Sequence, residues 1–186
     1  MDAFRLAFEK GFGVEVDIRD HLGRIVISHD PPTEALVEFE TLVSLANHFP
    51  DLPVAINVKS DGLAGELAGY EIANPHFYFD MSVPQERDFL KRGLTIASRI
   101  SEYESVEREL HDRLWVDAFA ADWYFTEPQS MTIIRGSTSA VFVSPELHGR
   151  DRLKTWGELG PLIKESGQLG ICTDYPLEFS ARWSAS

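Results

Sequence analysis

Two acids and a histidine near the N-terminus have the residue types and spacing that support hydrolytic chemistry. In Val14–Ile18 acidic and apolar residues alternate, so an extended chain points Glu15 and Asp17 to the same side. Asp20–Gly23 has the composition of a turn, and another β-branched run follows it. A hairpin formed in this way places His29 roughly opposite Glu15. Two carboxylates and an imidazole that converge could hold a metal ion and transfer a proton.

The same residues also have a purely structural interpretation. A Glu-x-Asp pattern is common on the solvated face of a strand, and His29 with its neighbours could form an ordinary strand end and turn. The elements that would position these side chains must therefore decide between the two interpretations.

The composition indicates a globular domain and excludes some classes of partner. A length of 186 residues suits one domain over residues 1–186, and the hydrophobic and charged fractions of 44% and 25% are those of ordinary globular proteins. The net charge of −13 argues against nucleic acid as the main partner, because binding a phosphate backbone needs a basic surface. An acidic chain that acts on a phosphate ester would need local cations or a bound metal ion.

Cysteine use and hydropathy predict a cytoplasmic protein. The single cysteine, Cys172, excludes an internal disulfide and fits a reducing compartment. No apolar run approaches the roughly 20 residues of a membrane span, so we expect no membrane-spanning segment. The first residues are amphipathic and include acids, which is not the layout of a signal peptide.

Short apolar strands alternate with helical patterns along the whole chain. This alternation predicts an α/β fold with parallel strands covered by helices. Strands are expected to begin near Val14, Val54, His76, Leu94, Arg113, Ala140 and Gly170, with one extra hairpin arm at Ile25. Helices are expected at Ala3–Lys10, Thr33–His48, Gln85–Arg92, Ser105–Asp112 and Leu153–Ser166, and a loop at Asp122–Pro128. Seven parallel strands are one fewer than a closed (β/α)8 barrel of the TIM type requires.

Polar residues gather where the predicted strands end, which is the rim that carries active sites in such barrels. Arg99, with Glu102, could orient a substrate there or form a structural ion pair. Asp80 and Asp117 lie in otherwise apolar strands, where an isolated carboxylate is costly, so we expect each to pair with Lys59 or Arg99.

The order of these motifs resembles the glycerophosphodiester phosphodiesterase family and its phospholipase-C-like barrel superfamily. The resemblance is carried by a helix, then VEVDIR, a turn and IVISHDPP, then a strand that ends in lysine (INVK) and a closing GICTDYP. It is strongest over Phe4–Pro32, fair at Ala55–Lys59 and good at Gly170–Pro176. The middle of the chain agrees in strand order rather than in motif.

The resemblance implies roles for individual residues. Glu15 and Asp17 match the family's metal-binding pair, which would hold calcium or magnesium through oxygen ligands. His29 matches the histidine that protonates the leaving alkoxide. Lys59 matches a lysine that could pair with the phosphate. The family's third metal ligand falls on Asn57, where a glutamate is usual, so one negative charge is lost.

A second departure concerns the family's first strand and the histidine that it carries. Neither has a counterpart here, so we expect a shortened or degenerate barrel of seven parallel strands. Such a barrel would leave the strands near Val14 and Gly170 with open edges, which favours a homodimer.

The leading hypothesis is a phosphoric diester hydrolase that acts on a small-molecule phosphodiester with a divalent cation. An alternative is an inactive barrel that binds a phosphorylated or sugar-like ligand. A third, weaker alternative is a sugar isomerase or aldolase with Lys59 as the Schiff-base residue.

Overall fold

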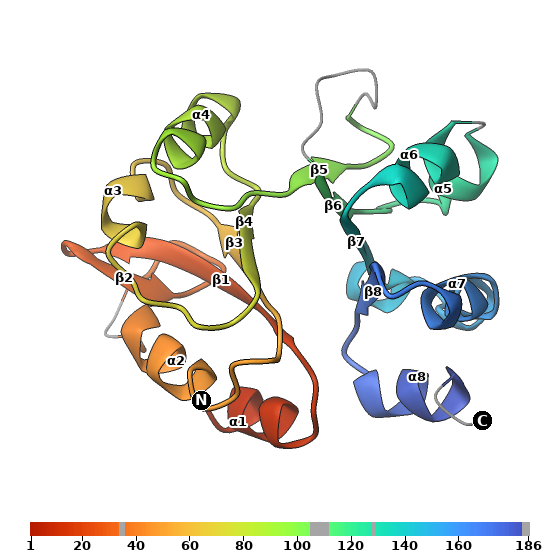
Figure 1. Cartoon of the computed structure of the whole chain (residues 1–186), viewed down its shortest axis with the longest axis horizontal. Helices are drawn as coiled ribbons and strands as arrows, with labels where there is room; N and C mark the ends of the chain where they lie inside the picture. Colours follow the sequence, from red (N-terminus) through yellow and green to blue (C-terminus); the bar gives the residue numbers. More distant parts are fainter. Residues whose placement is uncertain (34–35, 105–111, 128, 184–186) are drawn as a thin grey trace. The chain divides into compact units, whose positions relative to one another are not determined.

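The computed structural model describes residues 1–33, 36–104, 112–127 and 129–183 of the chain. It divides into two compact units, Met1–Ile96 and Ala97–Ser186, and each unit has a four-stranded sheet with helices packed on it (Figure 1). The protein is therefore α/β with largely parallel strands, as the alternation predicts. The expectation of one domain over residues 1–186 stays a prediction.

The first unit contains a sheet in the order β2-β1-β3-β4, in which only β2 runs antiparallel to its neighbour. Its strands are β1 (Val14–His21), β2 (Arg24–Ile27), β3 (Val54–Val58) and β4 (His76–Phe79). Its helices are α1 (Asp2–Glu9), α2 (Phe39–Ala46), α3 (Ala64–Leu67) and α4 (Val83–Lys91).

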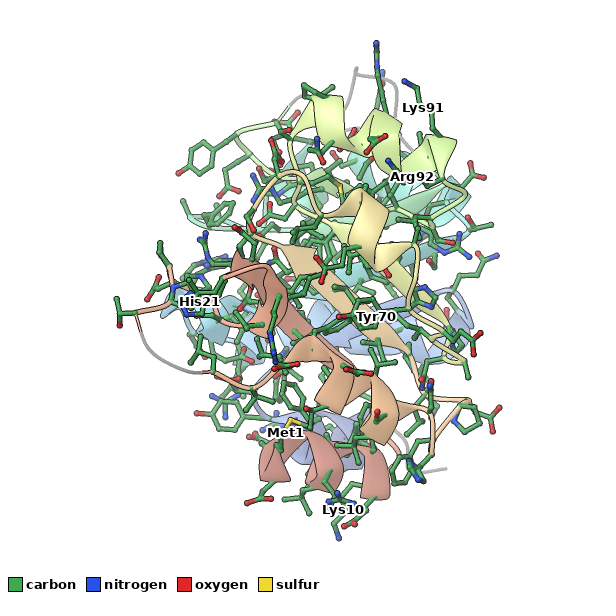
Figure 2. All side chains as sticks on the ribbon, turned by 90° about the vertical axis from the view of Figure 1, so that its left-hand side faces the viewer. Met1, Lys10, His21, Tyr70, Lys91 and Arg92 are labelled. Atoms are coloured by element: carbon green, nitrogen blue, oxygen red, sulfur yellow. The ribbon has the colours of Figure 1, made fainter. Side chains whose placement is uncertain are left out.

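The predicted hairpin is confirmed, because β1 and β2 pair in antiparallel register with Ile18 opposite Ile27. Leu22 and Gly23 form the turn with φ values of 51° and 77°, a left-handed conformation that glycine adopts without steric cost. Figure 2 shows His21 beside this turn, at the outer end of the hairpin.

One face of the first sheet packs against the helices. Alternate residues of β1 and β3, among them Val16 and Ile56, join Phe8 of α1, Phe39 of α2 and Phe89 of α4 in one buried cluster. The alternation of a β-strand then sends the intervening residues to the opposite face. The apolar periodicity of β1 and β3 therefore determines that Glu15, Asp17 and Asn57 lie on the face opposite the helices.

Helix α2 is shorter than the predicted Thr33–His48. Residues 34 and 35 lie outside the described part, and the chain at Val37 and Glu38 is extended: the Ile27 N–H donates to the Val37 carbonyl at 2.9 Å, and Val26 bridges Glu38. This segment thus completes the edge of β2, and the helix starts only at Phe39.

The second unit contains an all-parallel sheet in the order β5-β6-β7-β8. Its strands are β5 (Ser98–Ile100), β6 (Arg113–Val116), β7 (Ser139–Val143) and β8 (Leu169–Cys172). Its helices are α5 (Trp123–Thr126), α6 (Ser130–Gly136), the 3-10 helix η1 (Pro145–His148), α7 (Leu153–Glu165) and α8 (Pro176–Trp183). Side chains of α5, α6 and α7 join those of β6 and β7 in a second buried cluster.

Two elements of the second unit differ from expectation. The segment predicted as a loop at Asp122–Pro128 contains α5, whose Trp123 ring N–H donates to the Asp117 carbonyl at 2.6 Å; residue 128 lies outside the described part. Pro176 starts helix α8, which the sequence analysis did not predict, because proline fits the first turn of a helix. Most of the helix predicted at Ser105–Asp112 lies outside the described residues.

Open edges were predicted for the strands near Val14 and Gly170, and the structure agrees for the second of them but not for the first. Strand β8 is the last of its sheet among the described residues. Strand β1 instead lies between two neighbours, since it pairs with β3 over Val14–Ile18 and with β2 over Ile18–His21. The hydrogen bonds among the described residues define two four-stranded sheets and no closed barrel.

Candidate functional site

Four of the six predicted site residues lie together on the sheet face opposite the helices of the first unit. In the parallel pairing of β1 with β3, Glu15 lies opposite Ala55 and Asp17 opposite Asn57. Lys59 directly follows β3, and its N–H extends the ladder by donating to the Ile18 carbonyl at 3.0 Å. Strand period and register thus bring these side chains to the carboxyl ends of two adjacent strands.

A fifth residue, Asp80, joins them from the end of β4. The Lys59 ammonium nitrogen lies 3.1 Å from Asp80 Oδ2 and 3.4 Å from Asp17 Oδ1. All three side chains are largely shielded, with exposed fractions of 18%, 14% and 23% respectively. The expected pairing of Asp80 with Lys59 is confirmed. We call Glu15, Asp17, Asn57, Lys59 and Asp80 the Lys59 cluster.

The backbone of Asp80 is unusual, because its φ of 71° lies in the left-handed region. Residues other than glycine rarely adopt this conformation, although aspartate and asparagine tolerate it best. Such conformations persist where the surrounding structure holds them, and they concentrate at functional sites. Asp80 directly follows β4, at the point where the chain leaves the sheet, and its carboxylate forms an ion pair with Lys59.

The side-chain carboxyl of Glu15 has a perturbed pKa. Burial, together with the charge of Asp17, raises its pKa to about 7. Lys59 and a side-chain hydrogen bond with Asn57 act in the opposite direction, and Asp80 adds a further repulsion. Near neutral pH the Glu15 carboxyl is therefore divided between its neutral and charged forms, and a nearby cation would favour the charged form.

Asn57 contributes an unsatisfied oxygen to the same face. It is only 8% exposed, and its Oδ1 has no hydrogen-bond partner among the described residues. A buried carbonyl oxygen without a partner is costly in a native structure. Oxygen is also the ligand atom that calcium and magnesium prefer.

The donor atoms that this cluster offers to a metal ion are oxygens, the ligand type that hard divalent cations prefer. Within the described residues, no three or more histidine, cysteine, aspartate or glutamate side chains are grouped so that they could hold a metal ion. A metal site here would consist of the Glu15 and Asp17 carboxylates and the Asn57 amide oxygen. The unsatisfied oxygen and the mutual repulsion of the acids are the observations that support this set.

His29 lies near the cluster along the chain, but its imidazole does not join it. The Ser28 N–H donates to the Asp17 carbonyl at 3.1 Å, so the backbone passes beside β1. The His29 side chain is 71% exposed, and its Nδ1 lies 3.1 Å from Oδ1 of Asp30. Among the described residues, no hydrogen bond or ion pair connects the imidazole with Glu15 or Asp17. The predicted convergence of the three side chains is therefore not seen.

Arg99 belongs to the second unit and pairs with a different acid from the one expected. Its guanidinium forms two hydrogen bonds with Glu104, at 3.1 and 3.3 Å. Glu102 instead accepts backbone N–H groups from residues 119, 120 and 121. Burial alone would raise the pKa of Glu102, but these hydrogen bonds hold it below its usual value.

One prominent pair in the second unit was not predicted from the sequence. Asp117 was expected to meet Lys59 or Arg99, but its Oδ1 lies 2.6 Å from Nε2 of His148. The available signal was the cost of an aspartate at the end of an apolar strand, which requires a partner but does not say which one.

The comparisons with known proteins leave the function to be argued from the site. No protein-family model matches the sequence, and neither a curated protein nor a solved structure matches the chain. None of the helices in the described ranges has the length and apolar character needed to cross a membrane.

Proposed function

We propose that this chain is a phosphoric diester hydrolase of the glycerophosphodiester phosphodiesterase type. The observation that carries the proposal is the Lys59 cluster, in which a lysine lies between two carboxylates beside Glu15 and an unsatisfied amide oxygen. The substrate class is a small phosphodiester, and the assigned compartment is the cytoplasm.

A calcium or magnesium ion bound by Glu15, Asp17 and Asn57 would supply charge neutralisation for the phosphate. Lys59 adds a cationic group at the same strand ends and would pair with a non-bridging phosphate oxygen. Asp17 and Asp80 hold the lysine side chain in place until the substrate arrives.

His29 is assigned the role of proton donor. A water oxygen would form the new bond to phosphorus and release its proton to solvent. As the bond between phosphorus and the leaving oxygen breaks, the leaving alkoxide would take the proton of the His29 imidazolium and depart as the alcohol. The exposed position of the ring leaves it accessible to a substrate bound at the strand ends. The family's other acid–base histidine has no counterpart in this sequence, so we expect slow turnover.

We further propose that the fold is an incomplete (β/α) barrel of the phospholipase-C-like type. Support comes from each unit by itself: β3 and β4 follow β1 in chain order, and β5 to β8 are parallel and in chain order. Each sheet also carries buried aromatics outside its helix-side cluster, Phe77 and Phe79 in the first unit and Trp115 in the second. Barrels fill their interior with such side chains. A homodimer through the open edge of β8 is part of this proposal.

A second candidate function is ligand binding without catalysis. The observation that favours it is the separation of the His29 imidazole from the acids, together with the neutral Asn57 in place of an acid. The cluster would then bind a phosphorylated or sugar-like ligand and leave it unchanged.

The test is hydrolysis of bis(4-nitrophenyl) phosphate and glycerophosphocholine by the whole chain, with magnesium, calcium or chelator. We expect slow release of product, and chelator should abolish it. Asp17→Asn and His29→Asn should lose this activity. His48→Gln, which alters an exposed histidine, should keep the activity of the wild type. Activity that survives chelator, or no activity on either diester, contradicts the proposal.

Calorimetric titration with calcium, magnesium and glycerol 3-phosphate separates the second candidate from the first. Binding of glycerol 3-phosphate without any turnover supports the binding protein. Cation binding that Glu15→Gln leaves unchanged removes the metal site from both.

A further inference from the structure

A histidine and a buried aspartate form a fixed pair at the carboxyl edge of the second sheet. Asp117 directly follows β6 and is 7% exposed, while His148 ends the 3-10 helix η1 that follows β7. The distance of 2.6 Å between His148 Nε2 and Asp117 Oδ1 is that of a strong, charge-assisted hydrogen bond. The two residues are 31 positions apart in sequence, so the fold itself creates the pair.

The aspartate is held from several sides. Its N–H donates to the Ile100 carbonyl at 2.8 Å, and its carbonyl accepts the Trp123 ring N–H at 2.6 Å. Its Oδ1 also accepts the Ala118 N–H at 2.9 Å, and Arg150 donates to the Ala118 carbonyl at 2.7 Å. The carboxylate therefore cannot move far, and it fixes the orientation of the imidazole.

This arrangement determines which nitrogen of His148 is free. An aspartate carboxylate only accepts hydrogen bonds, so it places the proton of the neutral imidazole on Nε2. Nδ1 then carries a lone pair, and among the described residues it has no partner. The His148 side chain is 23% exposed, which leaves the ring partly accessible to a ligand. The result is an oriented hydrogen-bond acceptor.

The surroundings of the ring favour a neutral ligand with hydroxyl groups. The Phe119 ring packs against the imidazole with centroids 4.6 Å apart, and Tyr103, which is 74% exposed, lies 5.6 Å from Phe119. The adjacent charges are mainly negative, because Asp117 and Glu102 are acidic while Arg150 is paired with Asp122. This field repels anions, whereas aromatic rings offer a flat apolar surface to the C–H face of a sugar or polyol.

We propose that His148 and Asp117 form a binding site for a hydroxyl group of a neutral polyol or sugar. The ligand hydroxyl donates its hydrogen bond to His148 Nδ1, and the carbon skeleton packs on Phe119 and Tyr103. The site lies wholly within the second unit and does not depend on the proposed hydrolysis of phosphodiesters.

The first measurement is the tautomer of His148. Long-range ¹H–¹⁵N correlation spectra of the whole chain labelled with ¹⁵N-histidine should show the proton on Nε2 and the lone pair on Nδ1. A proton on Nδ1 overturns the proposal, because the acceptor would then be absent. His148→Gln identifies the resonance, and His48→Gln serves as the matched control.

The second measurement is titration with glycerol, myo-inositol and glucose, followed at the same resonances. We expect at least one probe to shift the His148 signals and to leave those of His48 unchanged. Asp117→Asn, which frees the tautomer, should weaken that binding by about tenfold.

Phe119→Leu should weaken the binding less and keep the tautomer, and it supplies a readout if Asp117→Asn fails to fold. No shift with any of the three probes, or equal binding by the wild type and by whichever of the two variants folds, overturns the proposal.

Discussion

The Lys59 cluster and the pair of Asp117 with His148 compensate in different ways for the cost of shielding charged side chains from water. In the Lys59 cluster of the first unit, three acids surround one lysine, Glu15 is partly neutral near pH 7, and the Asn57 oxygen lacks a partner among the described residues. In the second unit, the Asp117 carboxylate has defined partners and orients a histidine. A polar atom without a hydrogen-bond partner marks a place where a cation could bind, whereas defined hydrogen bonds mark a side chain that is preorganised.

The two histidines show the same contrast. His29 lies in a motif that resembles a catalytic sequence, yet its ring is mostly exposed, and its hydrogen-bond partner within the described ranges is Asp30, which is even more exposed. His148 lies in no recognised motif, yet its ring is fixed by a buried carboxylate. A motif therefore specifies a residue type, while the packing around it specifies whether that residue is positioned for chemistry.

The largest expected effect is on the ion pairs of the Lys59 cluster. Lys59→Met removes the cation between Asp17 and Asp80 and leaves two shielded carboxylates without it, so we expect a loss of about 3 kcal/mol in the free energy of unfolding. Chemical denaturation in the presence of chelator measures this change in the free energy of unfolding. Lys10→Met is the matched control, since Lys10 lies at the surface at the end of α1, as Figure 2 shows. A loss below about 0.5 kcal/mol, within the range of surface substitutions, would show that the acids do not depend on Lys59.

The pH dependence of stability tests the perturbed acid. Glu15 has a folded-state pKa of about 7 against an ordinary value of 4.5, so the stability that its protonated form contributes is fully present below pH 4.5 and is lost as the pH rises through 7. Glu15→Gln removes this dependence. In chelator at pH 8 the variant should be more stable than the wild type by about 2 kcal/mol, and the difference should vanish near pH 4.5.

Denaturation curves across this pH range give the answer, with Glu9→Gln, an exposed glutamate of α1, as the control. A difference that does not depend on pH would mean that burial and the neighbouring acids do not perturb Glu15.

The smallest effect compares the two histidines directly. His148→Gln should cost about 1–2 kcal/mol, because it removes the partner of the buried Asp117 carboxylate. His29→Gln should change stability by less than about 0.5 kcal/mol, as expected for an exposed side chain. Thermal unfolding of both variants at the same pH measures the pair. Equal costs would remove the distinction between a positioned and an unpositioned imidazole.

Most of the strands could be predicted from the sequence because each carries a short apolar run with a defined period. The predicted strand Val54–Val58 coincides with β3, and the hairpin follows from alternation and the turn at Leu22 and Gly23. Helix boundaries were less predictable where tertiary contacts compete with propensity. Val37 pairs with β2 rather than lying in a helix, and Pro176 begins α8, where no helix was predicted.

In both candidate sites, the sequence predicted the positions that follow from strand period and register, but not the side-chain contacts of the histidines. The period of two places Glu15 and Asp17 on one face, and parallel register adds Asn57 and Lys59. The orientation of the His29 ring depends on a side-chain torsion and on Asp30, which spacing does not determine. The pairing of His148 with Asp117 depends on how β6 and β7 align, and no local pattern records that alignment.

The left-handed backbone at Asp80 also limits how this protein can change over generations. Asparagine and glycine accept that conformation best, and both are reached from aspartate codons by a single-nucleotide change. Either substitution would abolish the negative charge and keep the chain path at the end of β4. Mutational drift could therefore remove one acid of the Lys59 cluster while leaving the surrounding architecture intact, and descendants with and without that acid would be hard to distinguish by their backbones.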